Sequence, residues 1–176
     1  MSFYMPPMKP GEYTTSTALS GDAKNVYRMD GGVFRWVTNS AAISNAGGKV
    51  VVHSLTNGAI TGTVVESVTV ADLTKVAGVI PIGTSGQGNA IALTTTLAAG
   101  SYFLLQLSGA SQIQANTVIT AGATLVVGTV TSGVSASMAT GVEGAFAVNA
   151  NLGYTTNTAV ATAAGQLIPC VLTRVA

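Results

Sequence analysis

The sequence predicts an all-β protein: a compact β-barrel, β-tulip or sandwich of short strands with an extended N-terminal arm. Short apolar runs rich in β-branched residues recur along the chain, and glycine-containing turns separate them. The three- and four-residue apolar spacing that marks an amphipathic helix is nearly absent. These observations together predict short strands joined by tight turns, as in barrels and sandwiches.

Residues 1–30 differ in composition from the rest of the chain. Three prolines, at positions 6, 7 and 10, favour an extended backbone, and no strand or helix period of apolar residues runs through the segment. The segment also holds four large aromatic residues without an evident local core, namely Phe3, Tyr4, Tyr13 and Tyr27. One interpretation is a disordered terminus; the other is an arm that orders on a partner and uses these aromatics as anchors. We divide the chain into this arm, residues 1–30, and a β-rich body, residues 31–176.

Strand-like segments begin after the predicted turn at residues 30–32. A pair of residues Ala-Gly precedes four of the later strands, and glycine supplies the positive φ that such turns need. Residues 71–75 are predicted to form one helical turn, and residues 148–164 a loop or weak helix. The predicted strands cover residues 33–37, 49–55, 63–70, 76–82, 90–93, 101–107, 123–127 and 166–172.

Residues 76–142 contain no Asp, Glu, Lys, Arg or His. Acid–base catalysis needs groups that titrate, so such a stretch is unusual in an enzyme. Ser, Thr and Gly interrupt the apolar residues too often for a transmembrane helix of about 20 residues. What remains is a β-rich body with a neutral, Thr- and Ser-rich surface, which can lie against another protein without burying charge. We therefore expect a structural or interaction protein.

The charge composition argues against a nucleic-acid or membrane partner. Charged residues make up 7% of the chain and the formal net charge is +1, so no long-range field attracts DNA, RNA or anionic lipid. The N-terminus lacks the basic start and apolar centre of a signal peptide, which predicts synthesis in a cytoplasm.

Titratable side chains are too isolated in the sequence to suggest a catalytic, cofactor or metal site. His53 is the only histidine and Cys170 the only cysteine, so we interpret both as structural. A hydrolase would require a spatial pair among three dispersed carboxylates, Glu66, Asp72 and Glu143. We expect no enzymatic activity and no cofactor.

The glycine-rich segment at residues 83–88 resembles a phosphate-binding loop superficially. It lacks the lysine of a P-loop, and no helical pattern follows it. A hairpin loop is the better interpretation.

From residue 73 onwards the order of elements resembles a known family. Val76-Ala-Gly-Val-Ile80 is followed by a strand, an Ala99-Gly100 turn and a further strand, then by Ile119-Thr-Ala-Gly-Ala-Thr-Leu125. The end has Leu152-Gly-Tyr and Ala159-Val-Ala-Thr-Ala-Ala-Gly165 before the last strand. This order is similar to that of the capsid decoration (cement) proteins of tailed bacteriophages. The resemblance covers residues 73–175; the preceding segment and the polar residues 155–157 depart from the family pattern.

The resemblance implies a structural virion protein that is made in the host cytoplasm and ends on the capsid surface. Its partner would be the major capsid protein, and it would stabilise contacts between capsid subunits. Phage symmetry and the family favour a homotrimer. The alternative is a receptor- or glycan-binding β-module of a phage fibre or spike, although the shaft repeat that usually precedes such a module is missing.

Overall fold

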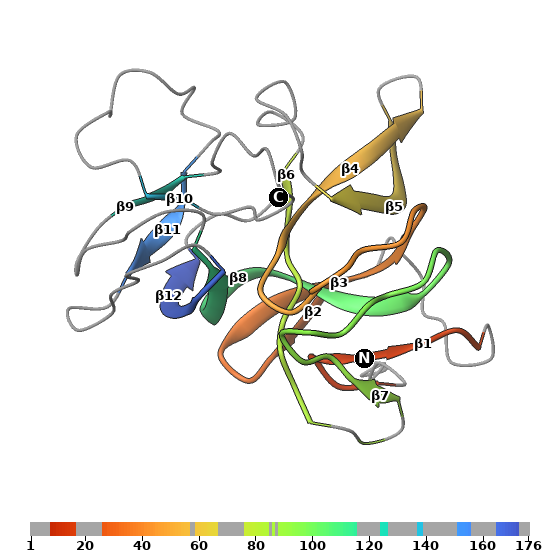
Figure 1. Cartoon of the computed structure of the whole chain (residues 1–176). Helices are drawn as coiled ribbons and strands as arrows, with labels where there is room; N and C mark the ends of the chain where they lie inside the picture. Colours follow the sequence, from red (N-terminus) through yellow and green to blue (C-terminus); the bar gives the residue numbers. More distant parts are fainter. Residues whose placement is uncertain are drawn as a thin grey trace, which may run out of the picture.

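The computed structural model describes residues 8–16, 26–56, 59–66, 76–84, 86, 88–115, 124–126, 137–138, 151–155 and 165–172. The described residues form strands and connecting loops without a helix, which confirms the all-β prediction (Figure 1). The strands are β1 (Glu12–Thr14), β2 (Val26–Met29), β3 (Gly32–Asn39), β4 (Val50–Thr56), β5 (Ala59–Glu66), β6 (Val76–Val79), β7 (Asn89–Ala90), β8 (Tyr102–Gln114), β9 (Thr124–Val126), β10 (Ser137–Met138), β11 (Asn151–Thr155) and β12 (Leu167–Leu172).

Five of these strands pair in a closed ring. β8 pairs with β6, β6 with β4, β4 with β5, β5 with β3, and β3 returns to β8. The β3–β5 pairing is parallel, whereas the other four pairings are antiparallel. Successive residues of a strand point to opposite faces, so every second residue of each strand faces the inside of the ring. Because the ring closes on itself, the inward-facing residues of the five strands meet one another.

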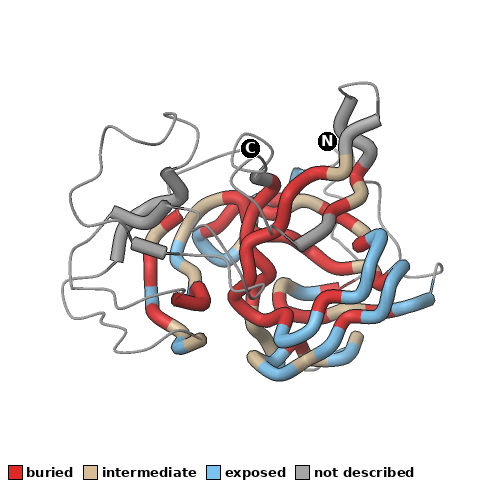
Figure 2. The backbone as a smooth tube through the Cα atoms, turned by 45° about the horizontal axis from the view of Figure 1, so that its top comes forward, coloured by how far each residue is buried: buried red, intermediate tan, exposed pale blue. Residues whose placement is uncertain are grey.

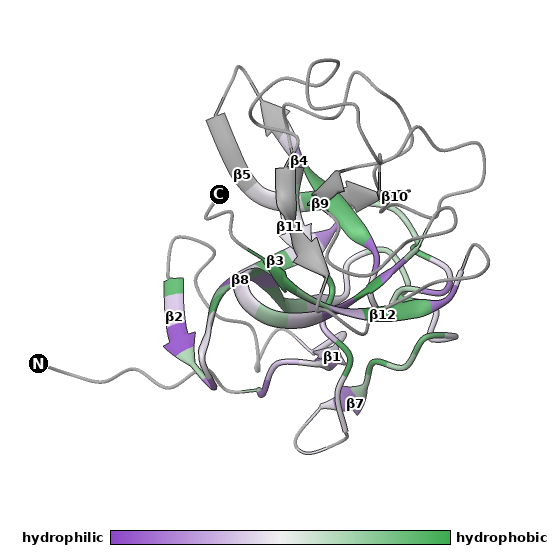
Figure 3. Cartoon of the chain, turned by 90° about the vertical axis from the view of Figure 1, so that its left-hand side faces the viewer, coloured by the Kyte–Doolittle hydropathy of each residue, from purple (hydrophilic) through white to green (hydrophobic). Residues whose placement is uncertain are grey.

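The main hydrophobic core is made by these five strands and the loops between them. Each of the five strands contributes at least one buried apolar residue, and Figure 3 shows hydrophobic stretches along β3, β4 and β8. Burying these side chains removes apolar surface from water, which is the dominant favourable contribution to the stability of a fold. The buried members from the ring strands are Val33, Val37, Val51, Val64, Ala77, Phe103, Leu105 and Leu107.

A second, smaller core covers the opposite face of β3 and β8. Phe34 and Trp36 of β3 and Leu104 of β8 point to this face, and Met8 and Tyr27 bury them. Trp36 is only 2% exposed. The alternation along β3 therefore supplies side chains to both cores, because successive residues of a strand face opposite sides.

β8 joins the ring to a second group of strands. Its first half pairs with β3, and its second half, from Gly109 to Gln114, pairs with β12. β12 continues to β11, β9 and β10, which Figure 1 shows beside one another on the left of the molecule. Gly109 lies where β8 changes partner, and its φ of 99° belongs to the region that favours glycine.

The structure confirms the strands predicted at residues 33–37 and 49–55 and extends the one predicted at residues 101–107. That strand continues through Ser108 and Gly109 because the later residues find a partner in β12. The prediction of a loop or weak helix is wrong for Asn151–Thr155, which forms β11 between β9 and β12. Pairing with two distant strands overrides a weak local preference there. The helical turn predicted at residues 71–75 lies outside the described residues.

The described part of the predicted N-terminal arm belongs to the folded body. β1 pairs with β7 and β8, and β2 pairs with β3 through a two-residue turn. Asp30 and Gly31 form that turn with φ values of 49° and 72°, as the Asp-Gly sequence of a tight hairpin favours. The structure differs from the extended arm predicted at residues 1–30 in that residues 12–14 and 26–29 pair with strands of the body. The described large residues of this segment pack on strands of the body: Met8 and Tyr27 in the second core, and Tyr13 against the main core.

Candidate interaction surface

Two loops lie side by side at one edge of the ring. Residues 40–45 follow β3, residues 92–100 precede β8, and an isolated bridge between Ile43 and Leu97 joins them. The N–H of each bridge residue donates to the carbonyl oxygen of the other at 2.9 Å. Both side chains are fully buried, so the bridge anchors the two loops to the main core.

The exposed residues of these loops share two properties: they are small and they are uncharged. We call this set of exposed residues the neutral loop face. Figure 2 shows, in pale blue, that exposed segments of the chain gather on the right-hand side of the molecule. Small side chains lose little rotamer freedom on binding, and a surface without charges loses little hydration energy when a partner covers it. The members are Ser40, Ala41, Ala42, Ser44, Asn45, Ala92, Thr94, Thr96, Ala98, Ala99 and Gly100.

Two buried amide side chains hold the neutral loop face in shape. Asn39 is 1% exposed, and its Nδ2 donates to the carbonyl oxygens of Ala41 at 2.7 Å and Ala98 at 2.9 Å. Asn39 thus ties the first loop to the second. Gln114, at the far end of β8, donates its Nε2 to the carbonyl oxygen of Asn45 at 2.5 Å. A surface that is already ordered avoids an entropic cost when a partner binds.

The structure describes two of the four aromatic residues that were predicted as anchors. Phe3 and Tyr4 lie outside the described residues. Tyr13 is half-buried in β1 and packs against the main core. Tyr27 is 7% exposed and belongs to the second core, so in this structure it stabilises the fold instead of presenting an anchor.

The titratable residues considered as catalytic candidates lie on three strands in the described part of the chain, and two of these strands, β4 and β5, pair with each other. His53 is buried on β4, Glu66 lies on β5, and Cys170 is buried on β12. Burial raises the pKa of the Cys170 thiol to about 12, which opposes formation of the nucleophilic thiolate. Asp72 and Glu143 lie outside the described residues.

The part of the chain that the structure describes has neither a cluster of metal-binding side chains nor a helix that could span a membrane. No three His, Cys, Asp or Glu side chains within it are grouped so that they could hold a metal ion. No helix in the described ranges has the length and apolar character needed to cross a membrane.

Three described glycines of the segment at residues 83–88, Gly83, Gly86 and Gly88, lie against β1 or the residues before it. Gly83 approaches Gly11 so closely that a Cβ atom on Gly11 would overlap the Gly83 backbone. Gly86 lies against the carboxylate of Glu12, which is fully buried. Here glycine is needed because two stretches of backbone come together.

Sequence reasoning missed the amides that organise this surface. Asn39 lies two residues beyond the strand predicted at residues 33–37, and neither Asn39 nor Gln114 had a predicted role. The sequence carries no signal for either residue, because their partners lie up to 69 positions away along the chain.

Comparisons with known proteins leave the family open. No family model matches the sequence, and no curated protein matches it. One similar solved structure is the N base of the head fiber protein gp8.5 of bacteriophage phi29. The two chains are 14% identical with a TM-score of 0.46, and the match covers 81% of this chain and 94% of that chain. Similarity at this level establishes neither a shared fold nor a shared function.

Proposed function

We propose that this chain is a structural protein of a tailed-phage virion: a capsid decoration protein that binds the outer surface of the head. The order of motifs between residues 73 and 175 supports the class. The neutral loop face is the structural observation that carries the proposal, because it offers a preformed surface with no charge to desolvate. Its partner is the major capsid protein, and the proposed role is non-catalytic.

The proposed mechanism is mechanical. A protein bound across the seam between two capsid subunits adds interface free energy that must be lost before the seam opens. Several copies joined to one another multiply this effect, because each further contact forms at high effective concentration. The protein is made in the host cytoplasm and needs no further chemistry to reach its place on the head.

Placing charge on the neutral loop face tests the proposal. Thr96→Arg and Ala99→Arg change exposed residues, and no side-chain hydrogen bond of either residue is part of the loop anchors. We expect each variant to bind purified heads that lack the protein at least about tenfold more weakly, on the order of 1.4 kcal/mol. Val26→Arg serves as the control, since it adds the same charge to a 45% exposed residue on β2.

Binding assays on purified heads distinguish three outcomes. The proposal stands if the two loop variants lose affinity while Val26→Arg binds as the parent chain does. Unchanged binding by both loop variants, with normal thermal unfolding, would show that another surface contacts the head. Equal loss in all three variants would show a general effect of positive charge.

We propose Phe3 and Tyr4 as additional contacts to the capsid, on the sequence evidence. Burying an aromatic side chain contributes about 1.5–3 kcal/mol before ordering costs are subtracted. The double variant Phe3→Ala/Tyr4→Ala is expected to reduce head binding without changing the thermal unfolding of the body. Equal affinity for the parent and the double variant would remove these two residues from the interface.

The copy number in purified virions separates the decoration protein from a fibre or spike module. A decoration protein is present in numbers comparable to the major capsid protein, whereas a fibre module is present at few positions. Quantitative mass spectrometry of virions measures this ratio. A ratio far below that of the major capsid protein would favour the fibre module.

A further inference from the structure

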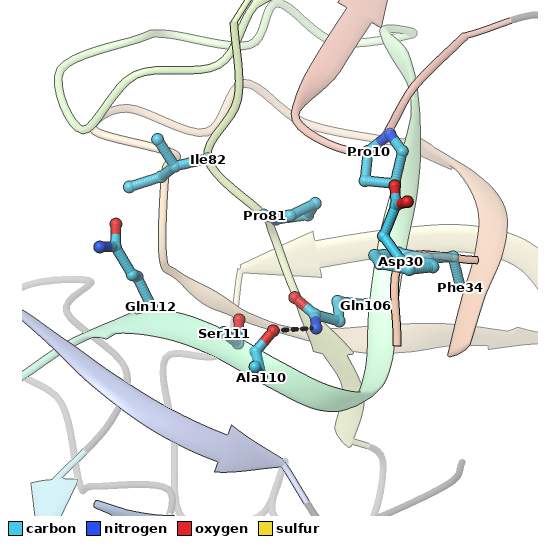
Figure 4. Close-up of a pocket in the computed structure, with 9 residues that line it drawn as sticks. All are labelled: Pro10, Asp30, Phe34, Pro81, Ile82, Gln106, Ala110, Ser111 and Gln112. Carbon is cyan, nitrogen blue, oxygen red and sulfur yellow. Dashed lines mark hydrogen bonds between the residues drawn. The ribbon is translucent and has the colours of Figure 1, made fainter. Parts of the chain in front are cut away.

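A hollow of about 360 Å³ lies between the residues before β1, the turn between β2 and β3, the residues after β6, and β8 (Figure 4). Four apolar residues from three segments of the chain form its walls: Pro10, Phe34, and the consecutive Pro81 and Ile82. Its volume is at the lower end of the range of about 300–1,000 Å³ that is usual for ligand sites. The hollow therefore suits one extended side chain or another small group.

The polar part of the hollow consists of the Asp30 carboxylate, the Ser111 hydroxyl and the amide side chains of Gln106 and Gln112. Gln106 donates its Nε2 to the carbonyl oxygen of Ala110 at 2.7 Å and to that of Ser108 at 3.3 Å. These bonds fix the amide plane, so Oε1 is the acceptor end that the side chain has left to offer. Gln112 is exposed and adds a second amide to the lining.

Asp30 is the single charged residue in the lining of this hollow. Its backbone is held in the tight turn between β2 and β3, and Figure 4 shows its side chain beside Pro10. Asp30 is exposed and makes no ion pair within the part of the chain that the structure describes. The hollow consequently presents a negative charge next to apolar walls, with no cation of its own to neutralise it.

We propose that this hollow is a socket for an arginine side chain of a protein partner. The guanidinium group pairs with the Asp30 carboxylate and donates to the amide oxygen of Gln106, which lies between Asp30 and Gln112 in the lining. The methylene stem packs along Pro10, Pro81 and Phe34. Arginine is among the residues that most often dominate interface affinity, and its planar group donates several hydrogen bonds in fixed directions.

The lining distinguishes arginine from other occupants. A phosphate or carboxylate ligand is disfavoured because the lining holds a carboxylate and no basic residue. A lysine ammonium pairs with Asp30 but cannot span acceptors that lie on several segments. A neutral sugar can bond the amides but gains nothing from the charge of Asp30.

The socket deepens the proposed function, because it specifies a basic side chain on the partner, and it can be tested without any capsid. Arginine amide serves as the probe, and citrulline amide, whose side chain has the same shape but carries no charge, serves as the matched control. Two-dimensional NMR of the full chain follows the side-chain amide signals of Gln106 and Gln112. We expect saturable shifts with arginine amide at millimolar concentrations, and shifts at least fivefold weaker with citrulline amide.

Asp30→Asn isolates the charge. Asn-Gly supports the same tight turn as Asp-Gly, so the backbone should be unchanged while the carboxylate is lost. We expect this variant to lose at least fivefold in affinity for arginine amide. Glu66→Gln removes the same charge on β5, away from the lining, and should bind arginine amide as the parent chain does.

Three results would overturn the socket. Equal binding of citrulline amide would show that the site does not recognise the cation, and unchanged binding by Asp30→Asn would show that Asp30 does not supply it. Saturable shifts of the same signals with N-acetylglucosamine, and none with arginine amide, would identify a sugar site. The proposed capsid function would survive each of these results, because head binding is measured separately.

Discussion

At the residue scale, Cys170 shows how burial makes a thiol unreactive. The thiol lies in β12, is 2% exposed, and faces apolar surroundings in which a thiolate is poorly solvated. Burial raises its pKa from 9.0 to about 12. The same environment that suits the neutral thiol therefore opposes both nucleophilic chemistry and oxidation.

We predict that Cys170 does not react with a thiol reagent at pH 8 in the folded protein. A colourimetric disulfide reagent should modify it only after denaturation, with an increase in rate of at least about a hundredfold, because the thiolate and its access are both suppressed. Rapid modification of the folded protein would show that β12 opens readily or that the thiol is not buried.

The raised pKa also predicts a dependence of stability on pH. Because the folded state holds the Cys170 proton more tightly, the contribution of this proton is complete below pH 9 and is lost as the pH rises from 9 to about 12. Comparison of the parent chain with Cys170→Ala in urea unfolding between pH 8 and pH 11 measures it. The free energy of unfolding should fall more steeply with pH in the parent; parallel curves would contradict the assignment.

At the element scale, the close approach of β8 to the turn between β2 and β3 depends on one glycine, Gly109. A Cβ atom on Gly109 would lie 2.5 Å from the carbonyl oxygen of Gly31 and 2.8 Å from the Cα atom of Gly32. Its φ of 99° adds backbone strain for any other residue. At this point the hairpin turn between β2 and β3 touches the strand that joins the two groups of strands.

We predict that Gly109→Ala destabilises the protein more than Gly100→Ala. Both positions have positive φ, but a Cβ atom on Gly100 meets nothing within 4 Å. Gly100→Ala should cost about 1–2 kcal/mol from backbone strain, and Gly109→Ala at least about 1 kcal/mol more because of the overlap. Chemical denaturation of both variants measures the difference, and equal costs would show that the turn at Gly31 moves aside freely.

The N-terminal strands give a second prediction at this scale. Deleting residues 1–30 removes β1 and β2 together with Met8 and Tyr27, and so uncovers Trp36 and Phe34. Losing two buried large side chains costs about 2–5 kcal/mol each, which is a large part of the stability of a typical domain. We expect the truncated chain to be unfolded or aggregated by circular dichroism. A truncated chain with parent-like unfolding would restore the boundary predicted at residue 30.

At the scale of the whole molecule, we predict self-association as a homotrimer that is insensitive to salt. Residues 76–142 contain no charged side chain, and the neutral loop face extends this property to residues 40–45. Contacts between such surfaces are apolar and backbone-mediated, and ionic strength screens only charges. Sedimentation equilibrium at low and at 1 M salt should give the same trimer mass; a monomer at high concentration, or dissociation by salt, would contradict the prediction.

The sequence by itself determined the class of fold and the character of the surface. β-Branched runs of strand length, separated by glycine turns, are local patterns, and the structure confirms them at residues 33–37 and 49–55. The absence of charge between residues 76 and 142 is likewise a property of composition. Such features can be predicted because each depends on residues that are close together in the chain.

Only the tertiary structure decided which strands are neighbours and where the surfaces lie. β8 runs on past Gly109 because β12 pairs with it, and β11 forms because β9 and β12 flank it. Asp30 borders a hollow because Pro10, Pro81 and Gln106 arrive there from distant parts of the chain. Tyr27 is buried because β3 and β8 present an apolar face to it. Each of these outcomes depends on contacts between residues far apart in sequence, whose pairing no local pattern specifies.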